Sequence, residues 1–214
     1  MLYADDGTGE RIEPYPSGRA ACPLCAGVIR ARCGQVNIWH WAHVSGGDCD
    51  SWSEPETDWH RAYQRIVPAD RREVPMGTHR ADLVSANGAV VELQHSSLSD
   101  EIAAREAHYG AMNWLFDARE AYWSNRLILR PGRDDSYVSF RWKQPRRSIT
   151  YCARPVLLDL GQGQVLHVKK IYAGPPCGGW ATSTRPWTSG DGSPPASGHI
   201  PRSSTGTAYP ICRN

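Results

Sequence analysis

The sequence predicts a mixed fold of the α+β or α/β class, with a small Cys/His module before it and a disordered tail after it. Cysteine and histidine pairs gather in residues 1–50, and helix-like and strand-like segments alternate through residues 51–172. Residues 173–214 contain 25 glycine, proline, serine or threonine residues out of 42. The full length of 214 residues is enough for one ordinary domain with such appendages.

Strands are expected where short apolar or alternating runs lie between turn signals. These segments are 27–31, 36–41, several within 71–94, 112–116, 126–130, 136–142, 155–160 and 164–171. The pattern predicts helices over residues 54–67 and 99–111. Ser99 is the expected N-cap of the second helix, and Asp100 and Glu101 would place negative charge in its first turn, where such charge favours the helix dipole.

The charge balance restricts the class of partner. The formal net charge is +2, and residues 1–172 contain 21 basic and 21 acidic side chains. This balance excludes a globally basic protein that coats nucleic acid, so a polyanion would have to meet a local patch. One such patch lies in residues 126–147, which carry seven basic residues against two acidic ones.

The sequence shows no sign of a membrane span or a secretory signal. No apolar run reaches about 18 residues, and no basic-then-apolar leader follows Met1. The seven cysteines would leave one unpaired in a disulfide scaffold. We therefore expect a cytoplasmic protein without a membrane partner, whose cysteines ligate metal.

Residues 173–214 are expected to be disordered, because a stretch so poor in aliphatic residues cannot bury enough apolar surface to offset the entropy of ordering it. Trp180 and Trp187 are unusual in a plain linker, so a docking peptide is the alternative to a dispensable extension. Cys177 and Cys212 would then lie outside the fold.

Two ligand pairs predict a zinc site in the N-terminal module. Cys22 and Cys25 are separated by two residues, as are His40 and His43, and fourteen residues lie between the pairs. This spacing is typical of tetrahedral Cys₂His₂ zinc. Such an ion would hold together a module too small to have a core of its own.

Two alternatives remain open for these residues. Cys33 or Cys49 could replace His40, because two histidines in extended chain do not both point inward automatically, and Cys49 is the stronger candidate. A redox Cys-x-x-Cys motif would instead have to open a helix, whereas a glycine and a strand-like run follow here.

A hairpin with one carboxylate in each arm is the second candidate site. Its two apolar arms contain Asp82 and Glu92, and charged groups there are costly unless they are paired or bind metal. A two-residue Asn-Gly turn would place Asp82 opposite Leu93, on the face away from Glu92. A three-residue loop over residues 86–88, with its glycine in the left-handed conformation, places Asp82 directly opposite Glu92. We predict the three-residue loop.

This register would build a divalent-cation site. Gln94 would project on the same side of the strand, and two carboxylates with a backbone carbonyl between them suit Mg²⁺ or Mn²⁺. Glu56, His60 and Gln64 recur at intervals of four residues and would share one helix face toward the site. The alternative for Glu56 is a capping box with Ser53. The chemistry of such a site is phosphodiester hydrolysis.

The ordered set of motifs resembles a known family. Cys-Pro-x-Cys, His-Trp-Ala-His, Glu56-x-x-x-His60, Arg80-x-Asp82 and Glu92-x-Gln94-x-Ser96 are similar to motifs of the competence protein CoiA-like nucleases of the PD-(D/E)xK superfamily. The resemblance covers residues 8–115, and more weakly the chain up to residue 172. It implies a zinc-ribbon-like module on a restriction-endonuclease-like core that cleaves DNA with divalent metal.

The resemblance also implies roles for single residues. Asp82 and Glu92 would be metal ligands, with Glu56 as the acidic residue of the helix and His60 as its neighbour in the site. Gln94 stands where the superfamily has a lysine; it can orient water but supplies no positive charge.

Several further residues are expected to contact DNA. Arg105 and Tyr109 resemble a pair that positions a phosphate, although a plain pair on a helix surface is an equal alternative. The basic residues expected to bind phosphates are Arg141, Lys143, Arg146 and Arg147.

A metal-dependent deoxyribonuclease is thus the leading interpretation of the sequence. The alternative is a zinc-stapled nucleic-acid-binding module without catalysis, in which Trp39 and Trp41 stack on bases or, more simply, pack within the module. A protein-interaction adaptor that uses the tail is a third and weaker hypothesis.

Overall fold

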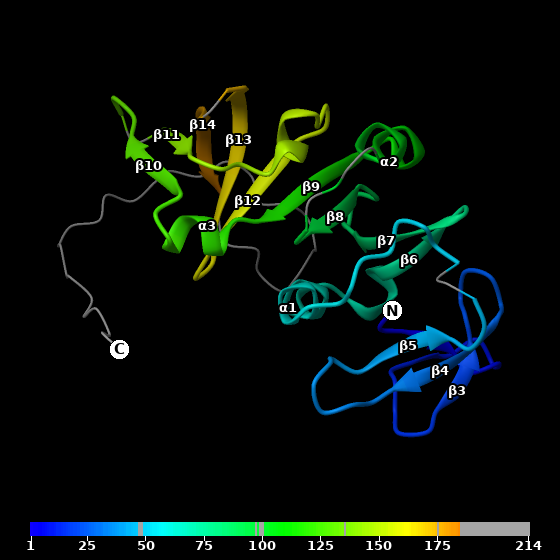
Figure 1. Cartoon of the computed structure of the whole chain (residues 1–214). Coiled ribbons are helices and arrows are strands. Elements are labelled where there is room, and N and C mark those ends of the chain that lie inside the picture. The colour runs from blue at the N-terminus through cyan, green and yellow to red at the C-terminus, as the bar shows by residue number, and fades with distance from the viewer. Residues whose placement is uncertain (47–48, 97, 99–100, 135, 175, 185–214) are drawn as a thin grey trace.

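The computed structural model describes residues 1–46, 49–96, 98, 101–134, 136–174 and 176–184. Within these ranges the chain forms two β-sheets with a few short helices, so the expected mixture of helix and strand is found in a fold that is mostly β (Figure 1). No helix in the described part is long and apolar enough to cross a membrane.

The N-terminal module is a five-stranded sheet in the order β2-β1-β3-β4-β5. Its strands are β1 (Ala4–Asp5), β2 (Arg11–Ile12), β3 (Arg19–Ala21), β4 (Val28–Arg32) and β5 (His40–His43). Trp41 is 1% exposed in the small core of this module, and its indole N–H donates to the Ile12 carbonyl at 3.1 Å. Trp41 therefore packs inside the module and does not stack on bases, whereas Trp39 is exposed.

The larger sheet has nine strands in the order β10-β11-β14-β13-β12-β9-β8-β7-β6. Their bounds are β6 (Arg72–Met76), β7 (His79–Val84), β8 (Val90–Gln94), β9 (Met112–Asp117), β10 (Leu127–Pro131), β11 (Val138–Trp142), β12 (Val156–Gly161), β13 (Gln164–Tyr172) and β14 (Cys177–Thr184). Strand β9 runs parallel to β8 and β12, and the other described pairings are antiparallel. Most of these strands were predicted to within a few residues.

Helices cover the large sheet on opposite faces. Helix α1 (Asp58–Ile66) contributes to one buried cluster, which includes Leu83 and Val91, and α2 (Ile102–Tyr109) to the other, as Figure 1 shows. The short α3 (Arg119–Trp123) was not predicted. Two 3₁₀ turns, η1 (Ala69–Arg71) and η2 (Arg147–Thr150), complete the described elements.

Helix α1 begins four residues later than predicted. Thr57 is the N-cap, in extended conformation, and its hydroxyl accepts from the His60 amide at 3.3 Å. Glu56 therefore precedes the helix, so the prediction that Glu56, His60 and Gln64 share one helix face is wrong. The proposed capping box of Ser53 and Glu56 is wrong for the same reason.

The second helix is shorter than expected at both ends. It spans Ile102–Tyr109 rather than 99–111, and Gly110, at a φ of +66°, follows its last residue. The predicted N-cap Ser99 and its neighbour Asp100 lie outside the described residues.

Strand β14 contradicts the prediction that the whole segment from residue 173 is disordered. It lies in the sheet between β11 and β13, and Cys177 and Ala181 are 1% and 0% exposed. Small residues are required because a Cβ at Gly179 would lie 2.6 Å from the Phe140 ring and 2.1 Å from the Lys170 carbonyl. Residues 185–214 lie outside the described part.

The position of β14 gives a testable prediction. A chain that ends at Tyr172 loses the strand that links β11 and β13, so we expect it to lose cooperative thermal unfolding. A chain that ends at Thr184 keeps all described pairings and should unfold at the temperature of the full chain. Circular dichroism melts of both proteins check this, and equal stability of the two truncations would contradict the role of β14.

Candidate functional site

The hairpin β7–β8 has the predicted register. Leu83 pairs with Val91, which places Asp82 opposite Glu92 across the two strands. Residues 86–88 form the loop, and its glycine has a φ of +81°, in the left-handed region. The three-residue loop and the shared face of the two carboxylates are therefore confirmed.

Glu92 is buried and Asp82 is half-buried, and one arginine lies beside them. The Leu93 amide donates to Asp82 Oδ2 at 2.8 Å, and Arg105 Nη1 donates to Glu92 Oε2 at 2.7 Å. Burial, followed by the charge of Glu92, raises the pKa of Asp82 well above its usual range. Burial also raises the pKa of Glu92, although Arg105 opposes this shift. The positive charge of Arg105 thus lies beside two carboxyl groups, those of Asp82 and Glu92.

Arg105 and Tyr109 point into the protein. Arg105 is 4% exposed, and its Nη2 donates to the Trp52 carbonyl and to Glu101 Oε2. Tyr109 is 8% exposed and packs edge-on against Trp52. They are therefore not a pair on the helix surface. Arg105 is also not free to bind a phosphate, because it donates to Glu92. Sequence reasoning missed this ion pair, which joins α2 to β8.

His60 lies beside the backbone of β8, at the residue after Glu92. Its Nε2 lies 3.1 Å from the Leu93 carbonyl oxygen, and its Nδ1 lies 2.8 Å from Thr57 Oγ1. Burial lowers the pKa of His60 below its usual range, so the ring is neutral at pH 7. His60 therefore contacts the backbone of β8 next to Glu92.

Gln94 reaches an acidic residue, Glu54, that was not among the predicted site residues. Its amide Nε2 donates to Glu54 Oε1 and, at 2.9 Å, to the Ser96 carbonyl. Arg146 Nη1 donates to the Gln94 carbonyl at 2.9 Å. The run of acidic residues before α1 was the available signal for Glu54, but its contact with β8 depends on the tertiary fold.

Glu56 lies against Arg61. Its side chain is 12% exposed, and Glu56 Oε2 lies 3.6 Å from Arg61 Nε. Burial and the neighbouring charge of Glu73 raise the pKa of Glu56 to about 7. The charge of Glu56 still contributes to the raised pKa of Asp82. Glu56 is thus a titrating group at neutral pH on the approach to the buried pair.

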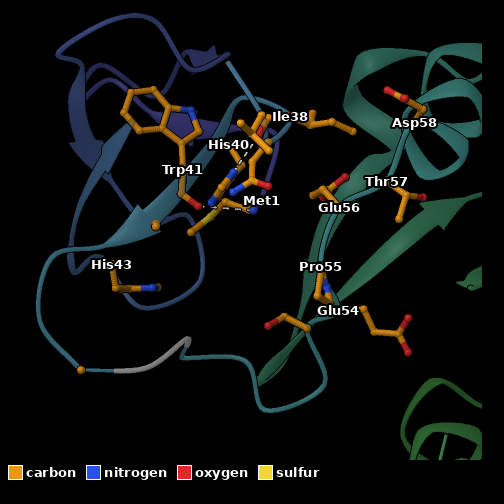
Figure 2. Close-up of a pocket in the computed structure, with 15 residues that line it drawn as sticks. Met1, Ile38, His40, Trp41, His43, Glu54, Pro55, Glu56, Thr57 and Asp58 are labelled. Atoms are coloured by element: carbon orange, nitrogen blue, oxygen red, sulfur yellow. Dashed lines mark hydrogen bonds between the residues drawn. The ribbon is translucent and has the colours of Figure 1, made fainter. Parts of the chain in front are cut away.

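An acidic cleft separates the N-terminal module from the segment before α1. Figure 2 shows His40, Trp41 and His43 on the module side and Glu54 to Asp58 facing them. The cleft has a volume of about 710 Å³. Glu54 and Glu56 line it, and Glu54 accepts a hydrogen bond from Gln94.

The four atoms of a metal site come together in the N-terminal module. The ligand atoms of Cys22, Cys25, His43 and Cys49 all lie within 4.8 Å of one another. The two sulfurs of Cys22 and Cys49 are 3.6 Å apart, and Cys25 Sγ is 3.3 Å from His43 Nε2. Tetrahedral zinc with Zn–S bonds of about 2.3 Å places two sulfurs about 3.8 Å apart, so this donor set fits zinc.

His40 is not part of the cluster. Its Nδ1 lies 2.8 Å from the Ile38 carbonyl oxygen, and the ring lines the acidic cleft. The predicted Cys₂His₂ set is therefore wrong at this position, and the alternative ligand Cys49 takes its place. A hydrogen bond from the Gly27 amide, followed by one with the His43 side chain, lowers the pKa of the Cys25 thiol to about 7. The thiolate, which is the form that binds metal, is thereby favoured.

The hairpin acids do not form a group of this kind. Among the residues that the structure describes, the Cys/His cluster is the only group of three or more His, Cys, Asp or Glu close enough to hold an ion. Asp82 and Glu92 supply two hard oxygens, which suit Mg²⁺ or Mn²⁺, but a third ligand would have to come from the backbone or water.

The residues expected to bind phosphates differ in accessibility. Arg141 and Lys143 are exposed, whereas Arg146 is half-buried and donates to Gln94. The side chain of Arg147 lies outside the described part of the structure.

Comparison with known proteins identifies no relative: no family model, no curated protein and no solved structure matches this chain.

The ligand assignment predicts the effect of two substitutions on zinc content. Cys49→Ser removes one ligand, so the purified protein should lose most of its bound zinc, as measured by elemental analysis. His40→Gln should keep zinc at the wild-type level because His40 lies outside the cluster. Cys33→Ser is the matched cysteine control. Zinc lost in His40→Gln and kept in Cys49→Ser would restore the Cys₂His₂ assignment.

Proposed function

We propose that this protein is a divalent-metal-dependent DNA nuclease that hydrolyses phosphodiester bonds. The observation that carries the proposal is the placement of half-buried Asp82 opposite buried Glu92, with raised pKa values for both carboxyls and Arg105 bound to Glu92. Buried carboxylates of like charge are costly and gather where chemistry requires them. The resemblance of the motif order to CoiA-like nucleases supports the same reaction.

The carboxylates and the adjoining backbone would hold Mg²⁺ or Mn²⁺. Asp82, Glu92 and the Leu93 carbonyl are the candidate ligands, all of them oxygens. When bound, the ion would polarise a phosphoryl oxygen and acidify an attacking water. Arg105 would remain beside Glu92 as a fixed positive charge.

Residues around the pair would handle water and protons. The Gln94 amide can orient a water by hydrogen bonding, although Glu54 accepts from it at present. Glu56, with a pKa of about 7, is suited to exchange a proton at neutral pH from the side of the acidic cleft. Neutral His60 would hold the Leu93 carbonyl in position.

A nucleic-acid-binding module without catalysis is the second candidate. The direct bond from Arg105 to Glu92 favours it, because this ion pair already satisfies one of the two expected metal ligands. Zinc would then stabilise the N-terminal module, and exposed basic residues would bind phosphates. Salt-dependent binding without cleavage under any divalent metal would identify this case.

Cleavage of labelled DNA tests the leading proposal. Wild-type protein incubated with single- or double-stranded DNA and Mg²⁺ or Mn²⁺ should cut it. Asp82→Asn and Glu92→Gln should each reduce the rate about 100-fold or more, because each removes a charged ligand.

Asp70→Asn is the control, since Asp70 is an exposed residue of η1. Wild-type rates in Asp82→Asn would exclude this site, and absence of cleavage with either metal would favour the binding module.

The raised pKa values also predict a pH effect on stability in protein free of Mg²⁺ and Mn²⁺ but loaded with zinc. Folded Asp82 retains its proton at pH values where the unfolded carboxyl, with an ordinary pKa of 3.8, has lost it. The free energy of unfolding should therefore fall as pH rises from about 4 toward neutrality. Glu92 and Glu56 act in the same direction.

Asp82→Asn should weaken this dependence and stabilise the protein at neutral pH, because the variant has no charge to lose hydration there. The asparagine oxygen can still accept from the Leu93 amide. Urea titrations across pH measure the effect. A variant less stable than wild type at neutral pH would show that the Asp82 charge is well compensated.

A further inference from the structure

One face of the C-terminal half of the large sheet combines basic and aromatic side chains. Across β10, β11, β14 and β13, Arg130 pairs with Ser139, Ser139 with Trp180, and Trp180 with Lys170. Paired residues in antiparallel strands project to the same side of a sheet. These four side chains therefore form a row across the sheet.

A second row runs beside the first. Arg141 pairs with Gly178, and Gly178 pairs with Tyr172. The opposite side of these strands carries Phe140 and Ala181, which are buried in the core. We call the outer surface formed by five residues the basic-aromatic face: Arg130, Arg141, Lys170, Tyr172 and Trp180.

The two aromatic rings of this face are accessible. Tyr172 is 57% exposed and Trp180 is 38% exposed. Tyr137 contacts Trp180 edge-on at 6.2 Å between ring centroids, which holds the indole on the sheet. Gly178 lies between Arg141 and Tyr172 and leaves the backbone uncovered there. A flat ring could approach the sheet at this point.

The charge of the face has one sign. None of the four strands β10, β11, β13 and β14 contains an aspartate or glutamate. Arg130, Arg141 and Lys170 make no ion pair with any residue of the described part. Arg126, by contrast, pairs with Glu120. The positive charge of the face is therefore available to an anion.

Two hollows lie along the basic side chains. One, of about 390 Å³, is lined by Arg130, Arg141 and Tyr172. The other, of about 370 Å³, is lined by Arg130, Arg141 and Lys143 together with Ile128. Both are within the size range of clefts that accept small ligands, and both join apolar surface to guanidinium groups.

We propose that the basic-aromatic face binds single-stranded DNA. Exposed aromatic rings stack on bases, and arginines and lysines spaced between them neutralise phosphates, which is how sheet surfaces bind single strands without sequence preference. A duplex hides the faces of its bases inside its own stack, so Trp180 and Tyr172 favour the single strand. The proposal rests on the proposed function for the identity of the polymer, but it concerns binding and not cleavage.

Fluorescence anisotropy with the full, zinc-loaded chain tests the proposal. The probe is a labelled DNA single strand of about 15 nucleotides. Binding is measured with Ca²⁺ in place of Mg²⁺ or Mn²⁺, and a gel checks that the DNA stays uncut. Trp180→Ala should weaken binding about tenfold and Trp180→Phe should restore most of the affinity. Replacing Arg141 and Lys170 by glutamine should flatten the plot of log affinity against log salt by about 0.7 for each phosphate that the protein no longer neutralises.

Trp123→Ala is the matched control, because Trp123 is 58% exposed on α3 and lies outside the face. It should bind the single strand like wild type. Three results would overturn the proposal: unchanged affinity in Trp180→Ala, an equal weakening for a duplex of the same sequence, or concentration-dependent self-association abolished by Trp180→Ala. If the wild-type protein binds single-stranded DNA but does not cleave it, and Trp180→Ala weakens that binding, the proposed nuclease activity is refuted while the proposed binding site is supported.

Discussion

The placement of half-buried Asp82 beside buried Glu92 is the constraint on which the rest of the structure depends. Two neighbouring carboxylates with so little exposure to water are stabilised because Arg105 binds Glu92 and the Leu93 amide donates to Asp82. Arg105 thereby fixes α2 against β8. A register shift of one residue would turn Asp82 to the opposite side of the sheet, against the apolar cluster beneath α1.

The N-terminal module is attached to the edge of the large sheet by polar contacts. The Glu73 carboxylate accepts from two backbone amides of the module, at 2.6 and 2.9 Å, and Arg11 donates to the carbonyls of η1 and β6. Asp50, next to the ligand Cys49, accepts from the Arg80 amide two residues before Asp82. A metal bound in the Cys/His cluster would therefore order the chain that leads to the acidic cleft.

Local chemistry made part of this site predictable from the sequence. Gly88, suited to the left-handed position of the loop, led to the predicted register that places Asp82 opposite Glu92. The spacing of the ligand pairs led to Cys22, Cys25 and His43, three of the four cluster residues. Tertiary contacts decided the rest. His40 turns to a neighbouring carbonyl, so Cys49 completes the cluster. The glycines and other small residues of β14 led to the prediction of disorder. In the fold, a small residue is needed at Gly179 because the Phe140 ring of β11 packs against it.

The central claim is that a divalent cation can bind at the carboxylate pair. Titration of zinc-loaded protein with Mn²⁺, followed by electron paramagnetic resonance, measures this binding directly and independently of any substrate. We expect bound Mn²⁺ in the wild-type protein and its loss in both Asp82→Asn and Glu92→Gln. Equal Mn²⁺ binding by the wild-type protein and both variants, or no binding at all, would contradict this claim.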